Sequence, residues 1–173
     1  MVDALAALPI GHGLDDGVRV GPLINAEACS TIESLLADAA DRGARVRLGG
    51  SRPDRTGFFF APTVLDRVPA DARILREEIF GPVAPIVEFH DVEHAVAMAN
   101  DTEYGLVSYI YTADLKHGLD VAAALESGTV ALNRGLVSDP AAPFGGVKQS
   151  GIGRAGGQDG VLDYTESKYL AIG

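Results

Sequence analysis

The chain has 173 residues and a formal net charge of −10, with 47% hydrophobic and 22% charged residues. This balance is typical of a folded globular protein and argues against disorder. The negative charge disfavours nucleic acid as a partner, because binding to nucleic acid depends on lysine and arginine. No stretch approaches the roughly 20 apolar residues that a membrane span needs.

The first part of the chain has helical patterns. Residues 1–8 resemble the end of a helix, and its start at an uncapped methionine suggests a shortened chain. Asn25 is a suitable N-cap for a helix that runs to about Arg42, and Gly43 stands where a left-handed terminator is expected. The buried face of this helix is predicted from apolar residues at helical spacing: Ala28, Ile32, Leu35, Leu36 and Ala39.

Extended segments follow this helix. Residues 45–48 alternate polar and apolar side chains, as a half-buried strand does, and residues 57–65 hold three of the six phenylalanines. The stretch 76–89 begins with adjacent carboxylates, bends at Gly81-Pro82 and continues from residue 83 as a β-branched strand. A charged turn fixed to the start of a strand presents side chains into a cleft, although acids that are merely solvated explain it equally well.

From this strand onward, helices and strands alternate. The expected elements are a helix over 92–100 capped by Asp91, a strand over 106–111, a helix over 115–125 capped by Asp114, and a strand over 129–132. Short connections between alternating elements indicate crossover units and a parallel sheet, hence an α/β fold. The stretch 164–172 regains β-propensity and predicts a terminal strand that adds to a sheet in this subunit or a neighbouring one.

The only cysteine, Cys29, is a weak candidate for a nucleophile. It follows the expected N-cap, and a helix start favours thiolates, but Glu27 and Glu33 oppose one and no histidine is near in sequence. We therefore interpret it as a structural cysteine. A single cysteine also permits no internal disulfide, which predicts a protein of the reducing cytoplasm.

The glycine-rich run 143–160 contains a loose Gly-x-Gly-x-x-Gly pattern at residues 151–156. A phosphate-binding loop needs a strand before this pattern and a helix after it, and neither is predicted here. A loop that packs closely against a cleft explains the glycines better. The four histidines show no metal-ligand spacing, so no metal is expected.

Three motifs, in this order, resemble the aldehyde dehydrogenase superfamily. They are EEIFGPV (Glu77–Val83), NDTEYGL (Asn100–Leu106) and PFGGVKQSGIGR (Pro143–Arg154), and GPLI (Gly21–Ile24) fits as well. The resemblance spans nearly the whole chain, but only the carboxyl-terminal third or so of such an enzyme. It implies a chain that starts shortly after the catalytic cysteine and lacks that cysteine, the general-base glutamate and the amino-terminal Rossmann-type cofactor domain.

The resemblance also implies roles for individual residues. Glu78 matches the acid that hydrogen-bonds the hydroxyls of the nicotinamide ribose, and a carboxylate suits two adjacent hydroxyls because it accepts two bonds. Phe80 matches the aromatic residue that helps to place the nicotinamide ring, and Phe144 matches the phenylalanine that lines the aldehyde pocket. At Ala155 the family commonly has a glutamate with a suggested proton-relay role, so that role is in doubt and no catalytic residue is carried over.

Within this family, NRGLVS (Asn133–Ser138) and YTESKY (Tyr164–Tyr169) are most similar to the succinate-semialdehyde dehydrogenases. In that group, a serine at the position of Ser138 binds the distal carboxylate of the substrate, together with arginines that lie outside this chain. Ser-Asp-Pro is also favourable turn chemistry, so a purely structural role for Ser138 stays open.

The alternating elements predict a parallel-sheet α/β core, and the resemblance implies a partial aldehyde dehydrogenase catalytic domain over residues 1–160 and an oligomerisation strand over residues 161–173. The complete enzyme is expected to be a cytoplasmic homo-oligomer that uses NAD or NADP to oxidise succinate semialdehyde to succinate, through a covalent cysteine adduct. The chain alone is expected to be inactive. Two alternatives stay open: a non-catalytic fragment that acts only by association, and a nucleotide-binding protein built on the glycine-rich run.

Overall fold

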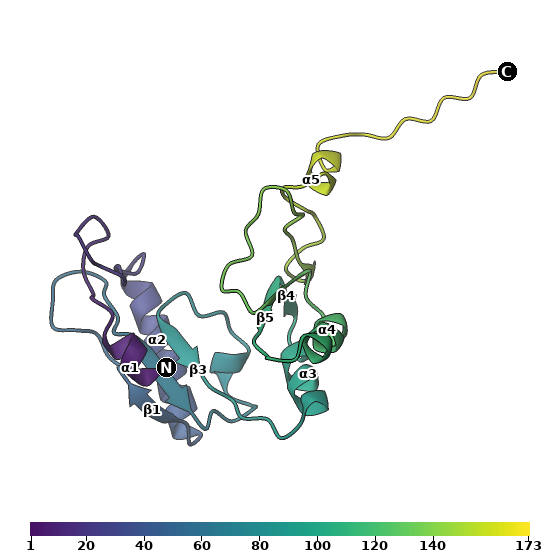
Figure 1. The fold of residues 1–173 in the computed structure, drawn as a ribbon. Helices are drawn as coiled ribbons and strands as arrows, with labels where there is room; N and C mark the ends of the chain where they lie inside the picture. Colours follow the sequence, from purple (N-terminus) through teal and green to yellow (C-terminus); the bar gives the residue numbers. More distant parts are fainter. The chain divides into compact units, whose positions relative to one another are not determined.

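The computed structural model describes residues 1–173, and the chain divides into two units, Met1–Glu88 and Phe89–Gly173 (Figure 1). The first unit contains α1 (Val2–Ala6), α2 (Ala26–Asp41), β1 (Arg45–Leu48), β2 (Thr63–Asp66), the 3-10 helix η1 (Arg73–Leu75) and β3 (Val83–Pro85). The second contains α3 (Val92–Asn100), β4 (Tyr104–Gly105), β5 (Val107–Ile110), α4 (Leu115–Ala124), β6 (Thr129–Leu132), β7 (Val147–Lys148) and α5 (Asp159–Leu162). None of these helices has the length and apolar character needed to cross a bilayer.

The main helix of the first unit, α2, forms as its sequence pattern predicts. Asn25 has an extended backbone, and its Oδ1 accepts a hydrogen bond from the Ala28 N–H at 2.8 Å, which confirms the N-cap. Gly43 has a φ of +105°, the left-handed conformation in which helices commonly end and which glycine adopts without strain. The predicted stripe is buried except for Ala28, which is half-buried, and Cys29 joins it with no exposed surface.

β2 is the central strand of the first unit, between β1, which runs antiparallel to it, and β3, which runs parallel. The strand that follows Gly81 therefore pairs with a strand before it, not with a later strand as the alternation predicts. Its regular pairing spans residues 83–85, and Pro82, just before it, has no N–H to donate. The Ile86 N–H still donates to the Leu65 carbonyl at 2.9 Å and extends the contact by one bond.

One hydrophobic cluster joins α2 to this sheet and to η1. Its buried members are Ile32, Leu35, Leu36, Ala39, Ala44, Phe60, Leu65, Val68, Ala72 and Ile74. The extended segment expected at 57–65 is a strand only over β2, but it delivers Phe59 and Phe60 to the interior. β1 occupies an edge of the sheet, and Val46 is 45% exposed, so the half-burial predicted for this strand is wrong.

The second unit confirms one of the predicted crossovers, in which a helix joins two parallel strands. Asp91 caps α3 by accepting from the His94 N–H at 2.8 Å, and Asp114 caps α4 by accepting from the His117 N–H at 3.0 Å. β5 and β6 pair in parallel along their whole length, and α4 connects them. β4 and β7 form a separate antiparallel pair, which attaches the glycine-rich run to the segment after α3.

The terminal strand expected over 164–172 is not formed within the single chain. α5 ends at Leu162, and the residues beyond it follow an extended path without a strand partner (Figure 1). Their apolar side chains are exposed: Tyr164, Tyr169, Leu170 and Ile172. A strand requires neighbouring backbone groups to hydrogen-bond, and this chain supplies none to the tail.

Candidate functional site

The two adjacent acids of the EEIFGPV motif have different surroundings. Arg73, in η1, donates to both carboxylate oxygens of Glu77, at 2.7 and 3.2 Å, and these hydrogen bonds lower the pKa of Glu77. Glu78 is exposed, and no hydrogen bond or ion pair within the chain engages its carboxylate. Glu77 is therefore held as a structural acid, while the acceptors of Glu78 are available to a ligand.

Asp38 fixes the turn that carries these acids to α2. Its carboxylate accepts from the Arg73 N–H at 3.0 Å and from Arg42 Nε at 3.0 Å. The backbone hydrogen bond from Arg73, and after it the side-chain hydrogen bond from Arg42, lower the pKa of Asp38. Arg73 Nη1 also donates to Ser34 Oγ at 3.1 Å. Because Arg73 holds Glu77 as well, one arginine links the helix, η1 and the acidic turn.

Glu78 and Phe80 line a single hollow of about 290 Å³ against the first turns of α2. The other residues that line it are Ile24, Asn25, Glu27, Ala28, Thr31, Ile32, Leu35 and Ile79. Gly81 permits this close approach, because a Cβ on it would lie 2.3 Å from Ile32 Cδ1. Phe80 is 73% exposed, so its ring is accessible from solvent. The fold thus brings together the two residues predicted to bind the cofactor.

Two polar residues of this hollow, Glu27 and Thr31, are missing from the sequence-based prediction. They lie one turn apart on the exposed face of α2, and in the sequence such a pair is indistinguishable from solvated helix surface. Only the fold places them in the same hollow as Glu78. With two carboxylates in its lining, the hollow favours a neutral group that bears hydroxyls over an anion such as a phosphate.

Ser138 lies in the loop that follows β6, and this loop begins at a left-handed asparagine, Asn133, with a φ of +56°. Asn133 Oδ1 accepts from the Thr112 N–H at 2.9 Å, and its Nδ2 donates to the Thr112 carbonyl at 2.8 Å. Asp139 makes the turn, since its Oδ1 accepts from the Ala141 N–H at 2.9 Å. Ser138 is exposed, and its hydroxyl takes no part in that turn.

Phe144 stands at the base of the glycine-rich run. Its backbone exchanges two hydrogen bonds with Ala155, at 2.8 and 2.7 Å, and these close the run into a loop. The loop packs tightly, because a Cβ on Gly128 would lie 2.1 Å from the Gly145 carbonyl oxygen. The helix after the run, α5, has four residues, too few for a phosphate-binding helix start. The run is a close-packed loop, as expected, and it holds a half-buried Phe144.

The four predicted residues fall in different units, Glu78 and Phe80 in the first and Ser138 and Phe144 in the second. Cys29, the residue rejected as a nucleophile, is a free cysteine with no exposed surface. A thiol without solvent access cannot reach an aldehyde. This burial fits the structural role predicted for it.

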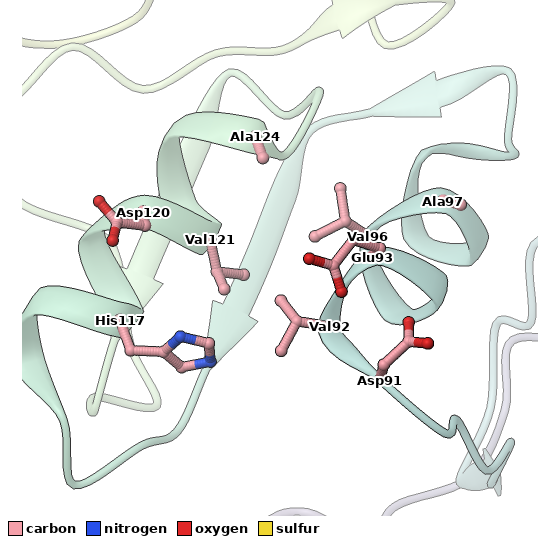
Figure 2. Close-up of a pocket in the computed structure, with 9 residues that line it drawn as sticks. All are labelled: Asp91, Val92, Glu93, Val96, Ala97, His117, Asp120, Val121 and Ala124. Atoms are coloured by element: carbon pink, nitrogen blue, oxygen red, sulfur yellow. The ribbon is translucent and has the colours of Figure 1, made fainter.

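A larger hollow, of about 690 Å³, lies between α3 and α4, and Figure 2 shows valines of both helices facing each other across it. The residues that line it are Asp91, Val92, Glu93, Val96, Ala97, His117, Asp120, Val121 and Ala124. Two of its acids are already paired, Asp91 with His90 at 2.7 Å and Asp120 with Lys116 at 2.8 Å. No set of three side chains in the chain could hold a metal ion. The hollow contains none of the predicted site residues and has the composition of a groove between packed helices.

Comparisons with known proteins agree with the three motifs. The profile of the aldehyde dehydrogenase family matches residues 1–170. Succinate-semialdehyde dehydrogenase (NADP(+)) of Escherichia coli is 49% identical over 98% of this chain, and glutarate-semialdehyde dehydrogenase of Pseudomonas aeruginosa is also 49% identical over 98% of it. A crystal structure of an E. coli NADP-dependent enzyme, 49% identical, covers 99% of this chain with a TM-score of 0.96.

The match covers only part of each of these proteins. The chain spans 35% of the length of both curated relatives and 36% of the E. coli crystal structure. The shared region contains the acidic turn, the segment Asn100–Leu106 and the glycine-rich loop. With a family profile that matches 170 of the 173 residues, the chain belongs to the aldehyde dehydrogenase family.

Proposed function

We propose that this chain forms the carboxyl-terminal part of the catalytic domain of an NAD- or NADP-dependent aldehyde dehydrogenase that oxidises succinate semialdehyde to succinate. One observation carries the cofactor half of the proposal: Glu78 lines the hollow with Phe80 and is unpaired, whereas Arg73 holds Glu77. Two adjacent ribose hydroxyls donate hydrogen bonds, and one carboxylate accepts both. When bound, the nicotinamide accepts the hydride that leaves the aldehyde carbon. Glu78 holds the ribose, and Phe80 supports the ring.

The second unit supplies the residues for the aldehyde. Phe144 lines the aldehyde pocket, and the Ser138 hydroxyl donates to the distal carboxylate of the substrate. The position of Asp139 supports this assignment, because Asp139 makes the turn and leaves the serine hydroxyl unused. A hydroxyl-to-carboxylate bond is charge-assisted, so it favours an aldehyde with a distal acid over a neutral one of similar length. Succinate and glutarate semialdehyde both carry that acid, and the similarity of residues 133–138 favours succinate.

The chain alone is expected to have no turnover. The reaction class needs an accessible thiolate as nucleophile, and the only cysteine here is buried. We place the complete enzyme in the cytoplasm, since a free cysteine and no disulfide suit a reducing compartment. The nucleophile and the base are expected to come from the remaining part of the complete enzyme.

A hybrid enzyme tests the proposal. In it, this chain replaces the corresponding carboxyl-terminal part of the E. coli relative, and reduced nicotinamide is followed with succinate semialdehyde, glutarate semialdehyde and butanal. We expect turnover of succinate semialdehyde by the hybrid, and none by the 173-residue chain alone. The unaltered E. coli enzyme is the positive control. A hybrid that folds and assembles but oxidises no aldehyde contradicts the proposal.

Ser138→Ala in this hybrid tests the substrate assignment. Loss of one hydrogen bond to a charged group is expected to lower kcat/KM for succinate semialdehyde roughly ten- to a hundredfold, while butanal is little affected. Asp139→Ala is the matched control, because it removes the turn and should lower both activities together. If Ser138→Ala also lowers both activities equally, Ser138 is a turn residue and the choice of substrate rests on similarity alone.

We further propose that residues 161–173 form the oligomerisation strand and that the complete enzyme is a homo-oligomer. The exposed side chains of Leu170 and Ile172 support this, because in an extended chain they share one face. Replacing both with aspartate should lower the oligomeric mass of the hybrid, measured by light scattering, towards that of a monomer. Thr165→Asp with Ser167→Asp adds the same charge at polar positions and should leave the assembly intact. The association-only alternative would show assembly by the tail without turnover.

A further inference from the structure

Lys148 has a backbone conformation that is unusual for its side chain. Its φ of +55° lies in the left-handed region, where only two other non-glycine residues of the chain are found. A long side chain in this region carries conformational strain, which persists where surrounding contacts determine the geometry. The glycine-rich run could have placed glycine at this position without that strain. The side-chain contacts of Lys148 explain why a lysine stands there.

The ammonium group of Lys148 has three partners at the end of α3 and beyond. Nζ donates to the Asn100 carbonyl at 2.8 Å and to the Thr102 carbonyl at 3.1 Å, and it pairs with Glu126 Oε2 at 2.5 Å. The Lys148 side chain is 25% exposed, so solvent screens these contacts only partly. The two carbonyls lie at the carboxyl end of a helix, where a cation is favoured.

Asn100 connects the same contacts to the end of α4. Its Oδ1 accepts from the Glu126 N–H at 2.8 Å, and its Nδ2 donates to the Ala124 carbonyl at 2.9 Å. Glu126 is thus held by its backbone to Asn100 and by its side chain to Lys148. The ammonium completes a closed network that joins the ends of both helices to the glycine-rich run.

The network fixes the far end of the glycine-rich loop. Next to Lys148, the Gln149 N–H donates to the Glu103 carbonyl at 2.9 Å, and the Gly105 N–H donates to Ser150 Oγ at 3.1 Å. The base of the loop is closed separately by the pair of Phe144 and Ala155. Both ends of the loop are therefore fixed. At the base, Phe144 is bonded to Ala155, and at the tip the loop is bonded to the segment after α3.

We propose that Lys148 is a positioning residue for the aldehyde site. Its ammonium fixes the tip of the loop formed by residues 143–155. The fixed loop in turn keeps the Phe144 side chain in one position. This role depends on the proposed function in one respect, the assignment of Phe144 to the aldehyde pocket. The attachment itself is a property of the chain alone and can be measured without an active enzyme.

Hydrogen exchange of the 173-residue chain measures the attachment. In Lys148→Met, the amides of Gln149 and Gly105 are expected to exchange at least about tenfold faster, while amides of β2 do not change. Lys116→Met is the matched control, because it removes the same charge from a side chain that is 86% exposed and pairs with Asp120 in its own helix. Equal exchange in Lys148→Met and Lys116→Met would overturn the proposal.

Two further variants separate the ammonium from the backbone. Lys148→Gly relieves the left-handed strain but loses the ammonium, so it should exchange as fast as Lys148→Met; slow exchange in this variant would overturn the proposal. Lys148→Arg keeps a cation and should restore part of the protection. In the hybrid enzyme, Lys148→Met should raise KM for the aldehyde about tenfold and leave KM for the cofactor unchanged. Fast exchange with unchanged kinetics would overturn the positioning role proposed for Lys148, although the attachment itself would stand.

Discussion

Phe60→Ala is expected to lower the free energy of unfolding of the unit Met1–Glu88 by about 3–5 kcal/mol. Phe60 has no exposed surface and belongs to the cluster that joins α2 to β2. Its removal loses the transfer free energy of the ring and leaves a cavity that a close-packed interior refills only in part. The free energy of unfolding of a domain is typically about 5–15 kcal/mol, so this one change removes a large part of it. Hydrogen exchange of the β2 amides, in the full chain, reads the change directly.

Phe58→Ala is the matched control for this measurement. The Phe58 ring is 44% exposed, and its main interaction, the acceptance of the Leu23 N–H by its carbonyl at 2.7 Å, belongs to the backbone. The alanine variant keeps that bond and should change the free energy by less than about 1 kcal/mol. Equal losses for Phe58→Ala and Phe60→Ala would show that the cluster is not the core of the unit.

In the hybrid enzyme, Glu78→Gln is expected to raise KM for the cofactor, or lower kcat, by roughly ten- to a hundredfold in total. The amide keeps the shape of the side chain but replaces one charged acceptor with an N–H₂ donor, so it cannot accept from both ribose hydroxyls. KM for succinate semialdehyde should change little, because the aldehyde residues proposed here are Ser138 and Phe144. Initial rates at varied concentrations of each substrate separate the two effects.

Glu77→Gln provides the internal comparison. It makes the same chemical change one residue earlier, at the acid that Arg73 already holds. The ion pair is about half exposed on both sides, so its loss should cost little stability and leave cofactor kinetics unaltered. If the two variants behave alike, or if Glu78→Gln leaves both KM and kcat unchanged, Glu78 does not bind the cofactor.

Local chemistry in the sequence predicts the three long helices of this chain, α2, α3 and α4. Each N-cap identified from a single polar residue, Asn25, Asp91 and Asp114, accepts the expected backbone hydrogen bond. This success has a physical reason, because a cap and an apolar stripe act within a few residues of each other. The parallel pairing of β5 and β6 follows in the same way from the helix between them.

The remaining errors concern contacts that the local sequence does not encode. The sequence around residues 83–85 does not indicate that this strand pairs with β2. The tail at 164–172 has the composition of a strand but no strand partner in the chain. Thr31 likewise looks like solvated helix surface until the acidic turn lies against it. For the site, the sequence singled out Glu78 and Phe80 together, but the left-handed Lys148 depends on carbonyls that are more than forty positions away.

The loop that begins at Asn133 is attached again at Pro140, whose carbonyl accepts from the Gly157 N–H at 3.0 Å. Asn133 is bound to the backbone of Thr112, and Phe144 is bound to the backbone of Ala155, so neither anchor depends on the side chains between them. Changing the length of such a loop is inexpensive, since each doubling costs only about 0.6 kcal/mol of closure entropy. Descendants of this sequence can therefore exchange residues 134–138, with Ser138 among them, for another segment while the scaffold folds as before. With the role proposed for Ser138, selectivity for aldehydes would be carried by a replaceable segment, and the side-chain amide of Asn133 marks where that segment attaches.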